Sequence, residues 1–259
     1  MASSYPKTRL FVEPDDVAPM QRGAVLSCEG DRAHYLTRVM RLKEGDALAV
    51  FNGRDGCWRA IISQTAKKSV WLTLQEQLSA PLAGPDVWVC FAPIKFGRID
   101  YLAQKITELG AAKLQPVITD YTQSERVKTE RLRANAVEAA EQCERCDVPQ
   151  VAEPVSLRQL LADWPSDRPL LFADESGQGA LWAQSSGDDA PKQWGILIGP
   201  EGGFSPAERA LIYEQPFARG VSLGPRILRA DTAAITLLAL SAAHWGDWNL
   251  KPHFERGNA

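Results

Sequence analysis

The sequence lacks the long apolar runs that membrane-spanning helices require. Among its 259 residues, no uncharged apolar stretch approaches the roughly 20 residues that cross a bilayer. Residues 1–6 also lack the basic start and apolar centre of a secretory signal. We therefore expect a cytoplasmic protein without a membrane partner. The net charge of −3 provides no overall attraction to nucleic acid.

Cysteine and histidine are scarce, with five and three residues respectively. An odd number of cysteines does not suit a disulfide framework and is typical of a reducing compartment. Cys143 and Cys146 form the only C-x-x-C, and no second pair of ligands has metal-binding spacing. A redox motif would stand at the start of a helix, whereas this pair follows a predicted helix. We expect no metal site and interpret the cysteines as structural or incidental.

The common nucleotide-binding and hydrolase signatures are also missing. No G-x-G-x-x-G follows a strand, and no G-x-x-x-x-G-K-[ST] occurs. The absence of G-x-S-x-G argues against an α/β-hydrolase. A dinucleotide-binding fold, a phosphate loop and a serine hydrolase are therefore disfavoured.

Two glycine-rich loops in the last third of the chain are the strongest positive signal. The apolar run 196–198 ends in Gly-Pro-Glu-Gly-Gly at 199–203, and the run 221–223 ends in Gly-Pro at 224–225. Glycine lets the backbone approach a ligand closely. At the carboxyl edge of a parallel sheet, two such loops would form a ligand-binding crevice. Ordinary tight turns are the alternative.

A helix is predicted after each loop. Ser205, Pro206 and Glu208 follow the order of an N-cap, a first-turn proline and a capping box. The second helix starts near Asp231 and continues as a nearly all-apolar run to residue 243. Such a helix would be buried almost all round, either in a monomer core or in a subunit interface.

The remaining sequence divides at a proline- and glycine-containing linker, residues 79–85. Before the linker, five short β-prone runs alternate with turn signals, including Asn52-Gly53 and Asp55-Gly56 at a predicted hairpin. After it, strands and helices alternate, as a parallel α/β sheet requires. We therefore predict a small β-rich domain over residues 1–80 and a parallel α/β domain over residues 81–259.

One helix, predicted over 32–41 with Asp31 as its cap, interrupts the first domain. Its apolar residues form one stripe and its arginines point elsewhere. The stripe comprises Tyr35, Leu36, Val39 and Met40, and the arginines are Arg32, Arg38 and Arg41. The arginines would form either a solvated face or a face that contacts RNA.

These motifs together resemble the RsmE family of ribosomal RNA uridine-N3 methyltransferases, in the SPOUT superfamily. The resemblance rests on Gly199–Gly203, Leu223–Ala233, Lys105–Gly110 and Glu138–Gln142. Asp231-Thr-Ala replaces the family's usual Glu-Thr-Ala. The resemblance implies an N-terminal PUA-like β-barrel domain and a SPOUT domain with a C-terminal trefoil knot. It also implies a homodimer that uses S-adenosylmethionine to methylate N3 of a specific uridine in 16S ribosomal RNA, free or within the 30S subunit.

The resemblance also implies which residues bind the cofactor and the RNA. The predicted cofactor-binding residues are Ala173, Glu175, Gly199, Pro200, Gly202, Gly203, Leu223, Gly224, Ile227 and Leu228. The predicted RNA-binding residues are Arg32, Arg38, Arg41, Lys95 and Arg98.

Methylation at N3 requires removal of a proton from a weakly acidic nitrogen. Glu201 and Asp231 are candidate bases, and Arg229 is a candidate to stabilise a uracil oxygen. Alternatively, the two carboxylates complement helix N-termini, an interpretation that we favour for Asp231, and Arg229 pairs with one of them. A non-catalytic RNA-binding module, or methylation of a different RNA, is the alternative function.

Overall fold

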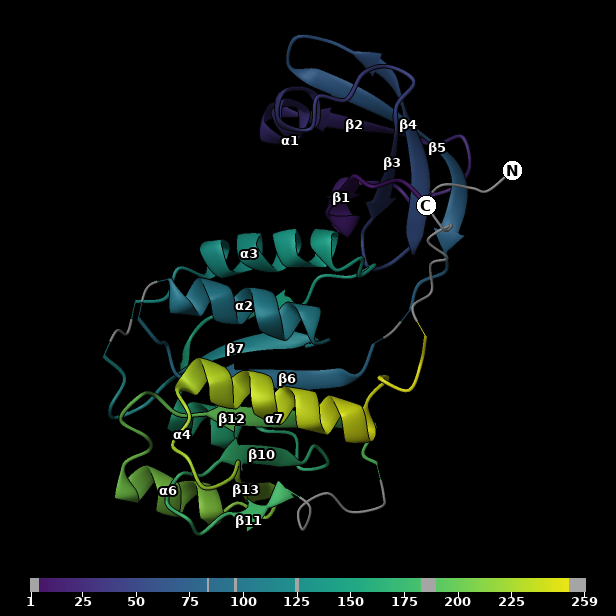
Figure 1. Ribbon diagram of the computed structural model, residues 1–259. Coiled ribbons are helices and arrows are strands. Elements are labelled where there is room, and N and C mark those ends of the chain that lie inside the picture. The colour runs from purple at the N-terminus through teal and green to yellow at the C-terminus, as the bar shows by residue number, and fades with distance from the viewer. Residues whose placement is uncertain (1–4, 83, 96, 124–125, 183–189, 252–259) are drawn as a thin grey trace. The chain divides into compact units, whose positions relative to one another are not determined.

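The computed structural model describes residues 5–82, 84–95, 97–123, 126–182 and 190–251 (Figure 1). The chain forms two compact units. The first comprises Met1–Leu82, Ala140–Val148 and the residues from Lys251, and the second comprises Ala83–Ala139 and Pro149–Leu250.

The first unit contains a curled sheet of strand order β1-β3-β4-β5-β2 (Figure 1). Its strands are β1 (Arg9–Phe11), β2 (Val25–Glu29), β3 (Ala47–Phe51), β4 (Cys57–Thr65) and β5 (Ser69–Ser79). β1 pairs with β3 in parallel, and the other pairings are antiparallel. A short 3₁₀ helix, η1 (Pro14–Asp16), follows β1. The predicted hairpin is confirmed, since β3 and β4 are adjacent antiparallel strands.

The helix in the first unit differs from the prediction. It begins earlier, as α1 (Gly30–His34), and continues as a π-helical turn, η2 (Tyr35–Val39), with Glu29 rather than Asp31 at the N-cap. The Met40 N–H donates to the Tyr35 carbonyl, five residues back. This wider turn rotates the side chains that follow.

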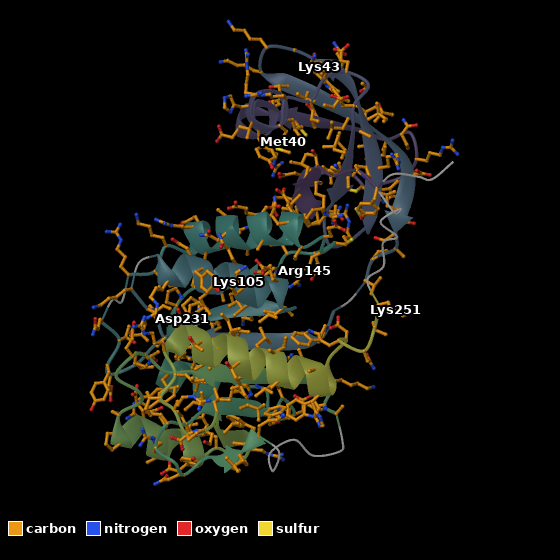
Figure 2. The ribbon with its side chains drawn as sticks, viewed as in Figure 1. Met40, Lys43, Lys105, Arg145, Asp231 and Lys251 are labelled. Atoms are coloured by element: carbon orange, nitrogen blue, oxygen red, sulfur yellow. The ribbon has the colours of Figure 1, made fainter. Side chains whose placement is uncertain are left out.

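The predicted apolar stripe is therefore wrong in its second half. Leu36 is fully buried, but Val39 and Met40 are 57% and 37% exposed. Met40 is labelled in Figure 2. Arg41 follows in the left-handed region, at φ 56°. The helix therefore ends before residue 41.

The second unit is an α/β fold whose recorded strand pairings are all parallel. The strand order is β11-β13-β10-β12-β6-β7-β8, with β9 pairing off β7. The strands are β6 (Asp86–Phe91), β7 (Lys113–Ile118), β8 (Gln150–Val151), β9 (Val155–Ser156), β10 (Leu170–Ala173), β11 (Ala180–Leu181), β12 (Gln193–Ile198) and β13 (Ala218–Ser222). The helices are α2 (Arg98–Glu108), α3 (Thr129–Gln142), α4 (Leu157–Ala162), α6 (Pro206–Tyr213) and α7 (Ala230–Trp245). The predicted strand–helix alternation is confirmed.

Two apolar cores lie on opposite faces of this sheet, because alternate residues of a strand point to opposite sides. Val89 and Ile196 pack with α2 and α7 on one face. Cys90 and Leu197 pack with α4 and α6 on the other. α7, predicted to be buried nearly all round, buries one side against the sheet and leaves Ile235 and Leu240 half-buried.

None of the helices in the described part of the chain combines the length and the apolar composition that a bilayer span requires.

Candidate functional site

The carboxyl ends of β10, β12 and β13 surround a pocket of about 330 Å³. Three loops and the start of α7 line it, because parallel strands end at the same edge of a sheet. The lining residues are Ala173, Asp174, Glu175, Gly177, Ile198, Gly199, Pro200, Glu201, Gly203, Val221, Ser222, Leu223, Gly224, Pro225, Arg226, Ile227, Leu228, Arg229, Ala230 and Ala233.

Most of the residues predicted to bind a cofactor thus line one pocket. Gly202 is the exception: it is absent from the lining, and a Cβ there would contact Tyr121 at 3.4 Å. The lining residues that were not predicted individually are Asp174, Gly177, Ile198, Val221, Ser222, Pro225, Arg226, Ala230 and Ala233. They could have been found as immediate neighbours of the predicted loop residues.

Two glycines give these loops their shape. Gly203 has a φ of 71°, and a Cβ added to it would lie 2.2 Å from Glu175 Oε1. Gly224 has a φ of 99° in the second loop. Residues other than glycine are strained in this left-handed region. The first loop is also anchored where it ends.

The anchor is the predicted capping box of α6, which the structure confirms. Ser205 Oγ accepts a hydrogen bond from the Glu208 N–H at 3.2 Å, and Glu208 Oε2 accepts one from the Ser205 N–H at 2.9 Å. Glu208 Oε1 also accepts from the Asp120 N–H, after β7, at 2.8 Å. The loop 199–204 therefore runs between a buried strand and a fixed helix start.

An exposed apolar side chain projects beside this rigid loop system. Ile227 is 79% exposed, the highest value among the large hydrophobic residues described, and Leu228 beside it is half-buried. An exposed isoleucine side chain at the wall of a pocket can pack against an apolar or aromatic group of a ligand.

The carboxylates after β10 form an internal network. Tyr213 Oη donates to Asp174 Oδ2 at 2.6 Å, and Arg209 Nη2 donates to Glu175 Oε1 at 3.0 Å. Burial acts to raise the pKa of Asp174, but hydrogen bonds from Tyr213 and Ser176 and the Arg209 charge lower it below its usual value. Hydrogen bonds thus hold both side chains in place at the pocket wall.

Asp231 does not line the pocket but lies just inside the start of α7 (Figure 2). The N-cap position belongs to Arg229, two residues before Asp231, but Asp231 stands in the first turn of α7, where its carboxylate complements the helix N-terminus as expected. Its carboxylate accepts from the Thr232 N–H at 2.8 Å and pairs with Arg98 through Nε, at 3.0 Å, and Nη2. Burial acts to raise the pKa of Asp231, but the hydrogen bonds and charge of Arg98 lower it overall.

The other predicted acid–base groups are placed differently. Glu201 and Arg229 both line the pocket and are exposed. No ion pair is recorded for either one in the described part of the chain. They are therefore available to a ligand, whereas Asp231 is already neutralised by Arg98.

The predicted RNA-binding residues are divided between the two units. Arg32, Arg38 and Arg41 belong to the first unit, where Arg32 lies 3.4 Å from Asp16. Lys95 and Arg98 belong to the second unit, and Lys95 lines another cavity. Within the ranges that the structure describes, no group of three or more His, Cys, Asp or Glu residues could hold a metal.

Comparisons with known proteins match both units. Residues 82–242 match the model of an RNA methyltransferase domain, and residues 29–75 match that of an RNA methyltransferase PUA domain. A protein of Rickettsia conorii named ribosomal RNA small subunit methyltransferase E is 34% identical over 209 residues, which cover 80% of this chain and 84% of the relative. Its namesake in Synechocystis is 35% identical over 237 residues, covering 89% and 76%.

A solved structure extends the likeness to the fold. A methyltransferase from Legionella pneumophila, in complex with bound S-adenosylmethionine, superposes with a TM-score of 0.83. It is 29% identical, and the match covers 93% of this chain and 98% of that one.

Proposed function

The chain belongs to the ribosomal RNA small subunit methyltransferase E family, and we propose that it methylates N3 of a uridine in small-subunit ribosomal RNA. The cofactor is S-adenosylmethionine. The observation that carries this proposal is the pocket formed by the three loops after β10, β12 and β13.

The residues of this pocket fit the cofactor. Gly203 and Gly224 let backbone groups approach the ligand without a Cβ, and exposed Ile227 offers an apolar wall for the adenine. The carboxylates of Glu175 and Glu201 suit a cationic sulfonium ligand. When bound, S-adenosylmethionine supplies an electrophilic methyl group, so that no metal is needed.

The protein's own residues then have separate tasks. Glu201 is the base that takes the N3 proton of uracil, because it lines the pocket and no ion pair is recorded for it in the described residues. Arg229 stabilises the negative charge that develops on a uracil oxygen. Asp231 is a positioning residue that, paired with Arg98, holds the start of α7.

The reacting N3 lies on the Watson–Crick edge of the base. The uridine must therefore be unpaired or extruded when it reacts. The PUA domain, with Arg32, Arg38 and Arg41, would hold the RNA, together with Lys95 of the domain that carries the pocket, whereas Arg98 is occupied by Asp231. We propose a cytoplasmic location, because that is where an enzyme acting on ribosomal RNA would meet its substrate.

Two further features are proposed from family resemblance. The loop 223–229 threads through the loop 199–203 to form a trefoil knot, and α7 contributes to a homodimer. Half-buried Ile235, Ala239 and Leu240 on α7 supply an apolar strip for the dimer. Light scattering after size exclusion tests the dimer, and a monomeric mass would refute it.

The proposed function is tested by calorimetric titration with S-adenosylmethionine. Ile227→Asp places a charge at an exposed position without emptying the core, and we expect it to weaken cofactor binding at least tenfold. Val25→Asp is the matched control, because Val25 is 58% exposed and lies in the other unit. A folded wild type that does not bind, even with RNA present, would instead indicate a non-catalytic RNA-binding module.

The base is tested by comparing Glu201→Gln with Asp231→Asn in methylation of small ribosomal subunits. Loss of a general base lowers the rate by about 10²–10⁴-fold. We expect that loss for Glu201→Gln, and a smaller loss with an unchanged pH profile for Asp231→Asn. The reverse order would make Asp231 the base.

A further inference from the structure

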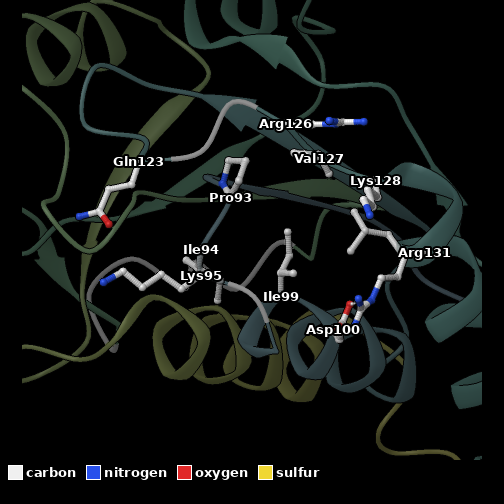
Figure 3. Close-up of a pocket in the computed structure, with 11 residues that line it drawn as sticks. Pro93, Ile94, Lys95, Ile99, Asp100, Gln123, Arg126, Val127, Lys128 and Arg131 are labelled. Atoms are coloured by element: carbon white, nitrogen blue, oxygen red, sulfur yellow. Dashed lines mark hydrogen bonds and ion pairs between the residues drawn. The ribbon is translucent and has the colours of Figure 1, made fainter.

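A second cavity, of about 250 Å³, lies at the carboxyl ends of β6 and β7, within the second unit (Figure 3). Its apolar part is formed by Pro93, Ile94, Ile99, Val127 and Leu132. Ile94 and Leu132 are only 4% and 2% exposed and belong to the core between the sheet and its helices. The cavity is therefore a depression in a well-packed part of the fold.

The rim of the cavity is cationic. Lys95, Arg126, Lys128 and Arg131 line it, against a single lining carboxylate, Asp100. Four positive charges and one negative charge give a local excess of +3, in a chain whose net charge is −3. Figure 3 shows Lys95 on one side of the apolar residues and Lys128 and Arg131 on the other.

The carboxylate is already neutralised. Arg131 Nε and Nη2 donate to the two oxygens of Asp100 at 3.0 Å and 2.5 Å. Lys95, Arg126 and Lys128 are exposed, and none of the three forms an ion pair within the described residues. Three cations around an apolar floor are left for an anionic ligand that also has an apolar face.

This cavity is next to the cofactor pocket in the fold. The Arg98–Asp231 ion pair lies between the two: Ile99, which follows Arg98, lines the second cavity, and Ala230, which precedes Asp231, lines the first. The main chains also meet there, since the Ala92 N–H donates to the Ile198 carbonyl at 2.9 Å. A strand of RNA whose target base enters the cofactor pocket would therefore pass the second cavity.

We propose that the second cavity binds one nucleotide of the single-stranded RNA substrate, adjacent to the uridine that is methylated. Its phosphate contacts Lys95, Arg126 and Lys128, and its base lies on the apolar floor of Ile99 and Val127. A nucleotide combines an anionic group with a flat apolar face, which matches the two parts of the lining. This inference rests on the proposed function, because it assumes an RNA substrate.

The test measures RNA binding as a function of salt. A fluorescently labelled single-stranded oligoribonucleotide containing the target uridine and its neighbours is titrated with wild type and with Arg126→Ala/Lys128→Ala. Both side chains are exposed, so their loss leaves the core intact. Each phosphate contact on a single strand contributes about 0.7 to the slope of log K against log salt.

We expect the double variant to lower that slope by about 0.7, because both side chains contact the same phosphate. If the affinities converge at 1 M salt, this slope makes the variant roughly 5-fold weaker at 0.1 M. The control is Arg158→Ala/Lys192→Ala, which also removes one exposed arginine and one exposed lysine. Arg158 lies on α4, on the opposite face of the sheet, and Lys192 precedes β12, at the opposite edge. The control should keep the wild-type slope.

Competition separates a nucleotide site from a simple phosphate site. Uridine monophosphate should displace the oligonucleotide from wild type better than inorganic phosphate does. Equal competition by the two would refute the base contact. Equal slopes for the variant, the control and wild type would refute the cavity as an RNA site and favour an acidic protein segment as its occupant.

Failure of this inference is distinguishable from failure of the proposed function. The double variant should bind S-adenosylmethionine with wild-type affinity in calorimetry, because none of its changes lies in the first pocket. If wild type methylates the RNA and the variant does so equally well at subsaturating RNA, only the inference about the cavity is wrong. If wild type neither binds the cofactor nor methylates, the proposed function itself is wrong.

Discussion

Replacing Asp231 by asparagine removes the charge from the ion pair between α2 and α7. The side chains of Arg98 and Asp231 are 32% and 12% exposed. The pair thus lies between an exposed pair, worth about 0–1 kcal/mol, and a buried one, whose disruption costs about 3–5 kcal/mol. We expect Asp231→Asn to lower the free energy of unfolding of the second unit by about 2 kcal/mol at pH 7.

The effect of this substitution should depend on pH in a defined direction. The pKa of Asp231 is lowered in the folded protein, since the contacts with Arg98 and Thr232 outweigh its burial. A carboxylate with a lowered pKa stabilises the fold above its unfolded-state pKa, and the contribution is lost as the pH falls through the folded-state value. The difference between wild type and variant should therefore be constant from about pH 7 to pH 5 and shrink below about pH 4.

Urea unfolding followed by tryptophan fluorescence measures this difference. Trp194 on β12 and Trp245 on α7 have ring centroids 5.9 Å apart, so their emission reports on the packing of α7. Arg98→Met and the double variant complete a double-mutant cycle that isolates the pair from other effects of each change. A coupling energy near zero, or a difference that persists unchanged to pH 3, would refute this account of the ion pair.

Three further predictions follow from local contacts. Gly203→Ala should weaken S-adenosylmethionine binding at least tenfold by calorimetry, because Gly203 has a φ of 71°, which strains any residue with a Cβ and would shift the loop. Gly202→Ala, where the nearest contact of a Cβ is 3.4 Å, should bind normally, and equal losses would contradict the argument. Cys146 should react with iodoacetamide at pH 7 faster than Cys90 does, as measured in a mass-spectrometric time course. Hydrogen bonds from Cys57 and Ser79 and the Arg9 charge lower the pKa of Cys146 to about 6, whereas burial raises the pKa of Cys90 to about 12. Ser241→Val should lower the free energy of unfolding by about 1–3 kcal/mol. The buried Trp194 indole N–H donates to Ser241 Oγ at 3.1 Å, and this substitution removes its partner. Ser241→Thr keeps the hydroxyl and should lower the free energy of unfolding less in the same urea titration.

Local signals in the sequence predicted much of the second unit. The apolar run 196–198, the glycines of 199–203 and the capping box at Ser205 each depend on neighbours within a few residues. Short-range steric and hydrogen-bonding rules therefore suffice to place a loop between a strand and a helix there. The same rules found the loop after β13, and the parallel topology brought both loops to one pocket.

Contacts between distant residues could not be predicted in this way. Arg98 and Asp231 are 133 residues apart, and no local pattern shows that their side chains meet. The π-helical turn at Tyr35–Val39 was missed for another reason, since a regular helical period places Val39 and Met40 on the buried side. Leu36 is fully buried in a core that strands elsewhere in the first unit build, and no pattern within the helix shows that packing.

The sheet order gives a physical reason why the two cavities have different chemistry. β12 lies between β10, which serves the first pocket, and β6, which serves the second. On the β10 side, glycine loops expose backbone groups and an apolar Ile227, which suits a small cofactor. On the β6 side, the cations project from long side chains around an apolar floor, which suits a charged polymer. Arg98 and Asp231 neutralise each other between them, whereas Glu201 and Arg229 are exposed at the first pocket, which is the reason why we propose these two residues for methyl transfer.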